Sequence, residues 1–139
     1  MRLSDVRLTP LPGSPDIVLA KYRSCIFVNG CFWHGHKDCR YATRPKTNAE
    51  FWRTKIENNR ERDLKDYTFL ESLGWRVIVV WECELRKDRL DVTIATVREQ
   101  LDANRNSWLA DQSDRRQRRE EWQSEIRRRK ERAAEVLGR

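Results

Sequence analysis

Short continuous runs of apolar residues predict three β-strands. Residues 16–19 predict a short strand, and residues 22–28 a second one that ends at Asn29-Gly30. Residues 25–28 are apolar throughout, which suggests burial on both faces of a sheet. A third strand is predicted over residues 76–81, apolar after its first position and the most buried of the three.

Apolar positions spaced three or four residues apart predict a helix in the middle of the chain. Thr47-Asn48-Ala49-Glu50 has the form of a capping box, so the helix should begin at Asn48, and Gly74 should cap its end. Its inward face would consist of Trp52, Ile56, Asn59, Asp63, Tyr67 and Leu70. A bare carboxylate on that face would be costly, so Asp63 should be paired or functional. A second helix is predicted over residues 91–103.

The pattern divides the chain into three parts. Residues 1–13 form an extended leader, residues 14–110 a single domain, and residues 111–139 a charged helical tail. The tail has only a thin, interrupted apolar stripe of Trp122, Ile126, Ala133, Val136 and Leu137. A solvated helix or a frayed end is the simpler interpretation, and a helix that packs on a partner chain or on DNA phosphates is the alternative.

Composition narrows the class of partner. The 139 residues suffice for one domain with a modest core, and the net charge of +7 favours a polyanion. No apolar run is long enough to span a bilayer, so nucleic acid is favoured over a membrane. The first residues lack the apolar segment of a signal peptide, which predicts a reducing, cytoplasmic location. There, the four cysteines are better interpreted as metal ligands or core residues than as disulfides.

Two cysteines and both histidines fall within the nine residues 31–39, which indicates a zinc site. One possible ligand set is local and consists of Cys31, His34, His36 and Cys39. The other replaces His34 by Cys83, which follows the third strand. In an extended segment, His34 and His36 would point to opposite sides, so we favour the second set. Cys25 faces the core as a plain buried thiol.

Asp16, His34 and Asp63 have the residue types of a metal-dependent phosphodiesterase. A carboxylate at the start of a strand can hold Mg²⁺, and a neutral imidazole can take a proton from water while a carboxylate behind it fixes the tautomer. Simpler interpretations exist, since Asp16 could cap a turn and Asp63 could pair with Arg60 or Arg62.

An ordered set of motifs between Ser14 and Arg86 resembles the very-short-patch repair (Vsr-type) endonucleases. The motifs are Ser14-Pro15-Asp16-Ile17-Val18-Leu19, Val28-Asn29-Gly30-Cys31-Phe32-Trp33-His34-Gly35-His36, Pro45-Lys46-Thr47, Glu50-Phe51-Trp52, Glu61-Arg62-Asp63, Gly74-Trp75-Arg76-Val77 and Trp81-Glu82-Cys83. The resemblance implies an α/β fold like that of restriction endonucleases, a mixed sheet flanked by helices. It also implies a Mg²⁺-dependent nick on the 5′ side of the thymine in a T:G mismatch, with double-stranded DNA and mismatch-repair proteins as partners.

The resemblance also assigns roles to single residues. Asp16 and the backbone carbonyl of Val28 would bind Mg²⁺, His34 would be the catalytic histidine, and Asp63 would support it. The structural zinc ligands would be Cys31, His36, Cys39 and Cys83. The residues implied at the DNA are the aromatic wedge Phe32, Trp33 and Trp52, which would unstack bases beside the mismatch, and the neighbouring cations Arg44 and Lys46.

The sequence departs from the family pattern in four places. Val28 replaces a threonine, Asn29 stands in the catalytic region where a histidine often occurs, and the zinc loop is one residue longer. Family members also carry a longer segment before the aspartate, with a helix that supplies a glutamate, whereas fifteen residues precede Asp16 and none is a glutamate. Without that helix, one side of the sheet should be exposed, to be covered by the charged tail or by a second copy of the chain.

Three functions therefore compete. The first is an active mismatch-directed nicking endonuclease. The second is a zinc-stabilised DNA-binding module of the same lineage with weak or no nuclease activity. The third is a protein-interaction domain in which zinc supports the fold, and it predicts that Trp33 and Trp52 are packed away.

Overall fold

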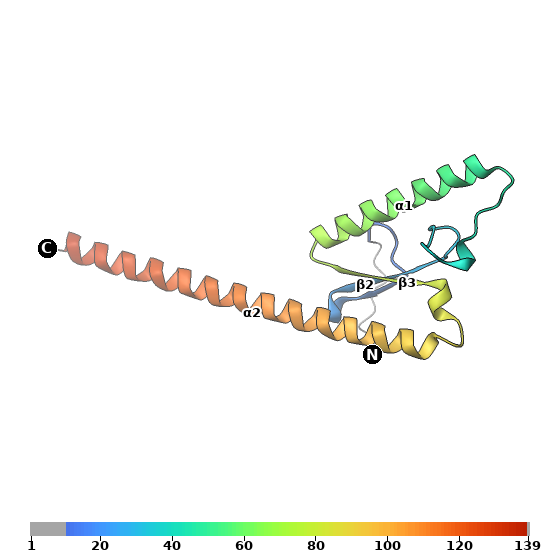
Figure 1. Cartoon of the computed structure of the whole chain (residues 1–139). Helices are drawn as coiled ribbons and strands as arrows, with labels where there is room; N and C mark the ends of the chain where they lie inside the picture. The colour runs from blue at the N-terminus through green and yellow to red at the C-terminus, as the bar shows by residue number, and fades with distance from the viewer. Residues whose placement is uncertain (1–10, 139) are drawn as a thin grey trace. The chain divides into compact units, whose positions relative to one another are not determined.

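The computed structural model of the chain describes residues 11–138, so most of the predicted leader lies outside the described residues. The chain divides into two compact units, one up to Arg105 and one from Asn106 to Arg139. The first unit contains the sheet, α1 and the first turns of α2 (Figure 1). The second unit contains the remainder of α2. In the described part, no helix is long and apolar enough to cross a membrane.

Three strands form a mixed sheet in the order β1-β2-β3. β1 (Ile17–Leu19) pairs antiparallel with β2 (Ser24–Asn29), and β2 pairs parallel with β3 (Arg76–Trp81). A short 3-10 turn, η2 (Ala20–Tyr22), joins β1 to β2. All three predicted strands are therefore confirmed, although β2 begins two residues later than predicted and includes Asn29, which pairs with Trp81.

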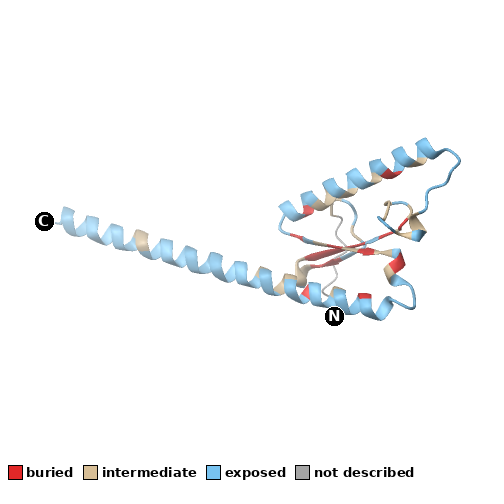
Figure 2. Ribbon diagram, in the orientation of Figure 1, coloured by how far each residue is buried: buried red, intermediate tan, exposed pale blue. Residues whose placement is uncertain are grey.

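The most buried strand is β2, not β3 as predicted. Five of the six residues of β2 are buried, whereas β3 alternates between buried and partly exposed positions (Figure 2). The difference follows from position, because β2 has a hydrogen-bonded neighbour on each side and β3 lies at an edge of the described sheet.

α1 (Ala49–Ser72) begins and ends where its sequence predicts, but its predicted capping box is absent. Asn48 adopts a left-handed conformation (φ 55°) without a side-chain cap, and Glu50 instead pairs with Arg53 at 2.6 Å. At the other end, Gly74 has φ 89° and its N–H donates to the carbonyl of Glu71 at 3.0 Å. The N–H of Trp75 reaches back to the carbonyl of Leu70 at 3.1 Å, which completes a Schellman motif.

α2 (Leu90–Leu137) is one continuous helix of 48 residues, so the predicted end at residue 103 is wrong. Its sequence contains neither proline nor glycine, and nothing local therefore stops it. Two further 3-10 turns, η3 (Arg40–Ala42) and η4 (Glu82–Leu85), lie next to the cysteine-rich segments.

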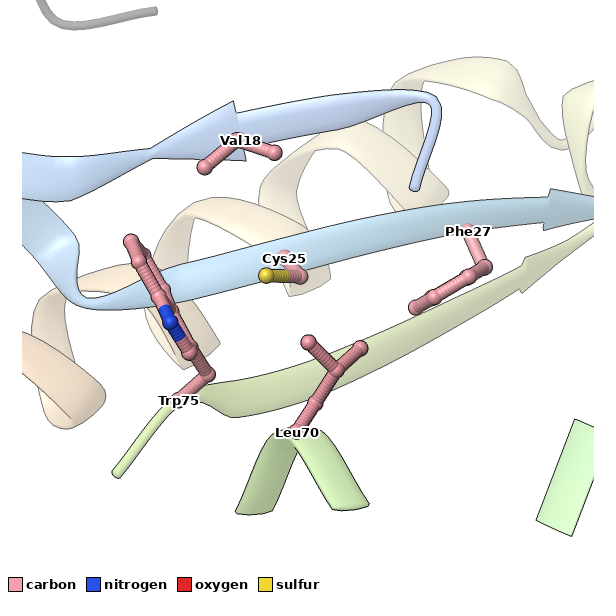
Figure 3. Packing of buried hydrophobic residues seen from close by; sticks show 5 residues of the cluster. All are labelled: Val18, Cys25, Phe27, Leu70 and Trp75. Carbon is pink, nitrogen blue, oxygen red and sulfur yellow. The ribbon is translucent and has the colours of Figure 1, made fainter. Parts of the chain in front are cut away.

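Each face of the sheet packs against a helix. Toward α1, the core consists of Val18, Cys25, Phe27, Leu70 and Trp75, whose side chains point toward one another in Figure 3. Toward α2, it consists of Leu19, Ile26, Ile78, Val80 and Leu101, with Val97 packed against them. The prediction of an uncovered side of the sheet is therefore wrong, because the first turns of α2 cover it.

Candidate functional site

The candidate site lies where β2 and β3 end. These strands are parallel, so their carboxyl ends meet at one edge of the sheet, where α/β proteins commonly bind ligands. The loop of residues 30–39 leaves β2 there, and η4 with Cys83 leaves β3 there.

Four metal-ligating side chains meet at this edge. The ligand atoms of Cys31, His36, Cys39 and Cys83 all lie within 4.8 Å of one another. Cys83 connects the strand end to the loop, since its N–H donates to Cys31 Sγ at 3.4 Å and its Sγ lies 3.5 Å from His36 Nδ1. The structure thus brings together the second of the two predicted ligand sets.

The reason for that choice differs from the predicted one. The loop is a compact turn, not an extended segment, as the bonds from His34 N–H to the carbonyl of Gly30 (3.1 Å) and from His36 N–H to that of Cys31 (2.9 Å) demonstrate. The turn directs His34 toward α1 and His36 toward the cysteines.

The donor set suits a soft metal ion. Burial, together with the neighbouring Cys31 and Cys39, raises the pKa of the Cys83 thiol to about 11. Burial also acts on Cys39, but hydrogen bonds from the Tyr41 backbone, the Cys31 and Cys83 side chains and the Ala42 backbone together outweigh it and lower the pKa of that thiol. Three clustered thiols deprotonate together only beside a compensating cation, and sulfur and imidazole nitrogen are the ligands that such a cation prefers.

His36 is held in place by Trp81, the last residue of β3. The two rings stack with centroids 4.1 Å apart and an angle of 7° between their planes. The stacking fixes the orientation of the imidazole, as partners behind a ligand do in metal sites.

His34 and Asp63 form the second cluster of the site. Asp63 Oδ2 lies 2.5 Å from His34 Nδ1, and the side chains are 18% and 25% exposed, respectively. A carboxylate at this nitrogen holds the proton on Nδ1 and leaves Nε2 as the acceptor. The alternative partners for Asp63, Arg60 and Arg62, form no ion pair with it in the described part of the chain.

Two further contacts hold the histidine loop against α1. Asn59 donates its amide to the carbonyl of Trp33 at 2.9 Å. Gly35 has φ 60° and lies so close to α1 that a Cβ built there would be 2.6 Å from Cγ2 of Ile56. The loop and the helix are therefore in register at three successive turns of α1, at Ile56, Asn59 and Asp63.

A cleft of about 410 Å³ opens beside the pair. Its polar lining includes His34, Asp63, Asn29 and Tyr67, and Trp81 forms part of its wall. Asn29, which is buried, donates its amide to the Tyr67 hydroxyl at 2.8 Å. The cleft therefore presents a base from the loop after β2, and a carboxylate and a phenol from α1.

The pKa of Tyr67 reflects the electrostatic potential in the cleft. Burial raises the pKa of its phenol, the bond from Asn29 lowers it, and the carboxylates of Asp63, Asp66 and Asp16 raise it again. The phenol remains protonated at neutral pH and can donate a hydrogen bond. The carboxylates create a negative potential here, which favours a cation.

Asp16 lies just before β1 and is exposed. Its Oδ2 accepts the N–H of Val28 at 2.7 Å, and its own N–H donates to the carbonyl of Ile26 at 3.0 Å. In an extended strand, the N–H and the carbonyl of one residue point to the same side, so the Val28 carbonyl is directed toward Asp16 as well. The structure thus joins Asp16 to Val28, but in the described residues it makes no hydrogen bond between Asp16 and His34 or Asp63.

The aromatic residues gather in one cluster. Phe32, Trp33 and Trp52 lie with ring centroids 5.3–5.9 Å apart, and Phe51 lies 5.1 Å from Trp52. Trp33 and Phe51 are about half exposed, at 50% and 57%, whereas Trp52 is partly covered. The cluster is not packed away, which counts against the protein-interaction interpretation. Arg44 and Lys46 are exposed in the segment between η3 and α1.

Tyr67, Asn59 and Phe51 also contribute to the site, although none of them was predicted as a functional residue. Asn59 and Tyr67 stood in the predicted inward stripe, and that stripe could have indicated two more polar groups near Asp63. Phe51 stood beside Trp52 in a motif already noted. The available signal was that this aromatic residue lies outside the predicted inward stripe of the helix.

Comparison with known proteins bears on the same residues. A family model described as DNA mismatch endonuclease Vsr matches residues 2–41, which include Asp16, His34 and three of the four clustered metal ligands. The Type II nicking enzyme V.NmeAIP of Neisseria meningitidis is 55% identical over 74 residues, covering 53% of this chain and 52% of the relative. The DNA mismatch endonuclease Vsr of Escherichia coli is 54% identical over 76 residues, covering 55% of this chain and 48% of the relative.

The chain is thus similar to Vsr-type endonucleases over about half of its length. The Type II nicking enzyme V.XorIIP of Xanthomonas oryzae agrees, at 53% identity over 54% of each chain. The resemblance predicted from the motifs is therefore confirmed. The chain spans about half the length of these Vsr-type relatives.

Proposed function

We propose that this chain is a Mg²⁺-dependent DNA endonuclease that nicks one strand on the 5′ side of the thymine in a T:G mismatch. The names of the similar proteins, a mismatch endonuclease and nicking enzymes, support a DNA strand as the substrate. A mixed sheet between helices is compatible with a restriction-endonuclease-like fold. The four unpaired cysteines fit a cytoplasmic protein.

The observation that carries the proposal is the hydrogen bond between His34 and Asp63 at the wall of a cleft. With its proton held on Nδ1, the imidazole of His34 offers Nε2 to a water molecule in the cleft and removes a proton as that water attacks the phosphorus. Asp63 keeps the ring oriented and stabilises the imidazolium that forms. General base catalysis of this kind typically contributes about 10²–10⁴-fold in rate.

Asp16 and the Val28 carbonyl are the groups that would hold Mg²⁺. The ion would supply Lewis-acid polarisation of the phosphate and stabilise the leaving oxygen. One oxygen of Asp16 is oriented by the Val28 N–H, and the exposed carboxylate retains further lone pairs for a metal. The carboxylates that raise the pKa of Tyr67 provide the negative potential that a divalent cation requires.

The cysteine–histidine cluster would hold zinc in a structural role. Three sulfur atoms and one nitrogen are the four donors that a structural zinc site uses, and they would leave no position open. The zinc would tie the loop after β2 to η4 after β3, and so set the position of His34 and of the adjacent aromatic cluster.

Phe32, Trp33, Trp52 and the neighbouring Phe51 would wedge between base pairs at the mismatch. A mismatched step is easier to unstack than a paired one, so the wedge would favour mismatched DNA. Arg44 and Lys46, in the exposed segment that leads to α1, would contact phosphates beside it.

The test is nicking of a duplex with one T:G mismatch, compared with the matched duplex, with and without Mg²⁺. We expect a nick beside the mismatched thymine that is lost in Asp16→Ala. His34→Ala should lose nicking while its zinc content is unchanged, and loss of zinc would show that His34 is a ligand. No nick in any condition, but tighter binding to mismatched than to matched DNA, would instead support the zinc-stabilised binding module.

A further inference from the structure

The part of α2 that lies in the second unit sorts its charges onto two faces. Residues three, four or seven apart share one face of a helix. One line of such positions runs through Arg115, Arg119, Trp122, Ile126, Lys130, Ala133 and Leu137. From Arg115 onward it contains no acidic residue, although Asp111 lies four positions before Arg115. Arg116 and Arg127 lie next to this line. We call Arg115, Arg116, Arg119, Arg127 and Lys130, with Trp122 and Ile126 between them, the basic face.

The opposite face of the same segment is mostly acidic or neutral, with Arg128 as its one basic residue. Its line of positions at the same spacing is Ser113, Gln117, Glu120, Ser124, Arg128, Glu131 and Glu135. A helix that is merely solvated has no reason to separate its charges, because mixed signs on each face provide more favourable pairs at three- and four-residue spacing. The separation therefore indicates a partner on one side.

Ion pairs occupy the arginines outside the basic face. Arg118 pairs with Asp114 at 2.6 Å. Glu125 lies within 3.2, 3.0 and 3.5 Å of Arg128, Arg129 and Arg132, respectively. By contrast, none of the five cations of the basic face forms an ion pair in the described part of the chain. They remain available to an external anion.

The spacing of the cations on the basic face and the exposed Trp122 are compatible with binding to double-stranded DNA. Arg119 and Lys130 are eleven residues apart, or about 16 Å at 1.5 Å per residue, whereas the major groove is about 12 Å wide. Cations so placed can contact phosphates on both sides of one groove. Trp122 is 66% exposed between them, where it can pack on the sugars. The apolar part of the face is too small for a lipid interface.

We propose that the basic face binds the phosphate backbone of double-stranded DNA, independently of base sequence. The proposal takes the polyanion from the proposed function but requires neither nicking nor a mismatch. It would supply the non-specific affinity that holds the chain on DNA while the aromatic cluster is searching for its site.

The experiment compares two variants of the full, zinc-loaded chain that both lose four positive charges. The test variant carries Arg115→Gln, Arg116→Gln, Arg119→Gln and Lys130→Gln. The matched control carries Arg118→Gln, Arg128→Gln, Arg129→Gln and Arg132→Gln, the four ion-paired arginines. Glutamine retains a helix propensity similar to that of arginine and lysine, and circular dichroism should give equal helix content for both variants.

Affinity for a matched 20-base-pair duplex is measured without Mg²⁺ over a series of salt concentrations. Each phosphate contact contributes about −0.9 to the slope of log K against log salt. We expect the slope to fall in magnitude by about three to four in the test variant and by less than about one in the control. Equal falls of the slope in the two variants, or no fall in either, would overturn the proposal. Binding to phosphatidylserine vesicles is measured in parallel, and a loss of affinity confined to the vesicles would also overturn it.

Nicking of the T:G duplex by the same proteins separates the two proposals. A test variant that has lost the slope but still nicks at saturating concentration supports both. An unchanged slope together with nicking overturns the basic face alone. A lost slope in a chain that never nicks supports the basic face and removes the proposed endonuclease function.

Discussion

Tyr67 and Asn29 link the helix side of the site to the strand side. The Asn29 amide is buried at the end of β2 and finds its partner in the Tyr67 hydroxyl, 38 positions along the chain. A buried amide without a partner would cost about 1–3 kcal/mol, so the phenol satisfies a group that β2 alone leaves open. The same hydroxyl lies at the cleft beside Asp63 and keeps its own proton to donate.

Tyr67→Phe should therefore lower the free energy of unfolding by about 1 kcal/mol, and Asn29→Ala by a similar amount. Because both changes remove the same hydrogen bond, the double variant should lose little more than either single one. The measurement is a double-mutant cycle by urea unfolding of the zinc-loaded chain. Tyr22→Phe is a matched control, since the Tyr22 hydroxyl makes no hydrogen bond among the described residues. Fully additive losses would contradict the coupling.

Cys25 makes stability depend on pH at the alkaline end. Burial between Val18, Phe27 and Leu70 raises the pKa of its thiol from 9.0 to about 11, although Arg23 opposes the shift (Figure 3). The folded state prefers the neutral thiol, so this stabilisation is complete below pH 9 and is lost as the pH rises toward 11. We expect a loss of about 1–3 kcal/mol across that interval.

Cys25→Ala removes this titration and is the comparison for the pH effect. Unfolding free energies of both proteins, zinc-loaded, are measured from pH 8 to 11. The difference in unfolding free energy between the two proteins should narrow as the pH rises, because only the parent protein loses the contribution of the neutral Cys25 thiol. Lysines and tyrosines titrate in both proteins, so their effects cancel in this difference. Parallel curves would show that Cys25 does not carry the effect.

At the scale of elements, the site depends on how closely the histidine loop approaches α1. Gly35 permits that approach for two reasons. Its φ of 60° is left-handed, and a Cβ built there would lie only 2.6 Å from Ile56 Cγ2, so no side chain fits. Gly74 also has a left-handed φ, of 89°, but the nearest atoms to a Cβ there belong to Arg23 at 3.8 Å. Both positions carry backbone strain when substituted, but only Gly35 is crowded, so a comparison of the two substitutions isolates the effect of crowding.

Gly35→Ala should destabilise the fold by about 2–4 kcal/mol, the sum of left-handed strain and overpacking. Gly74→Ala should cost only the strain, about 1–2 kcal/mol. Because the first change also moves His34 away from Asp63, it should reduce nicking at saturating DNA well beyond the second. Thermal and urea unfolding with single-turnover nicking test both expectations, and equal effects of the two changes would refute the crowding.

At the scale of the whole molecule, the cysteine–histidine cluster joins segments 52 positions apart, at Cys31 and Cys83. Cys83→Ser should release zinc and lower the melting temperature of the entire first unit, because binding of structural zinc is coupled to folding. Cys25→Ala, at a thiol outside the cluster, should keep one zinc per chain. Zinc content by atomic absorption and melting with and without chelator provide the readouts. Retained zinc and an unchanged melting temperature in Cys83→Ser would point to the local ligand set with His34.

Much of the secondary structure could be predicted from local sequence. The limits of β3, the helix from Ala49 and its glycine cap follow from interactions between near neighbours, and such interactions are the same in a peptide and in the folded chain. The end of α2 was missed although its cause is also local: the absence of proline and glycine carried more weight than the thin apolar stripe. The missing capping box at Thr47 is a different error, since a motif permits a cap without requiring it.

The sequence by itself determined the strands, the limits of α1, the candidate metal ligands and the resemblance of the motifs to a family. Only the tertiary structure decided which of these residues meet. His34 lies beside Asp63, and Cys83 beside Cys31, because β2 and β3 are parallel and end at the same edge, with α1 packed across one face. The cleft with Tyr67 and Asn29 has the same origin. Contacts between residues tens of positions apart depend on strand pairing and helix packing, and no pattern within a single segment encodes them.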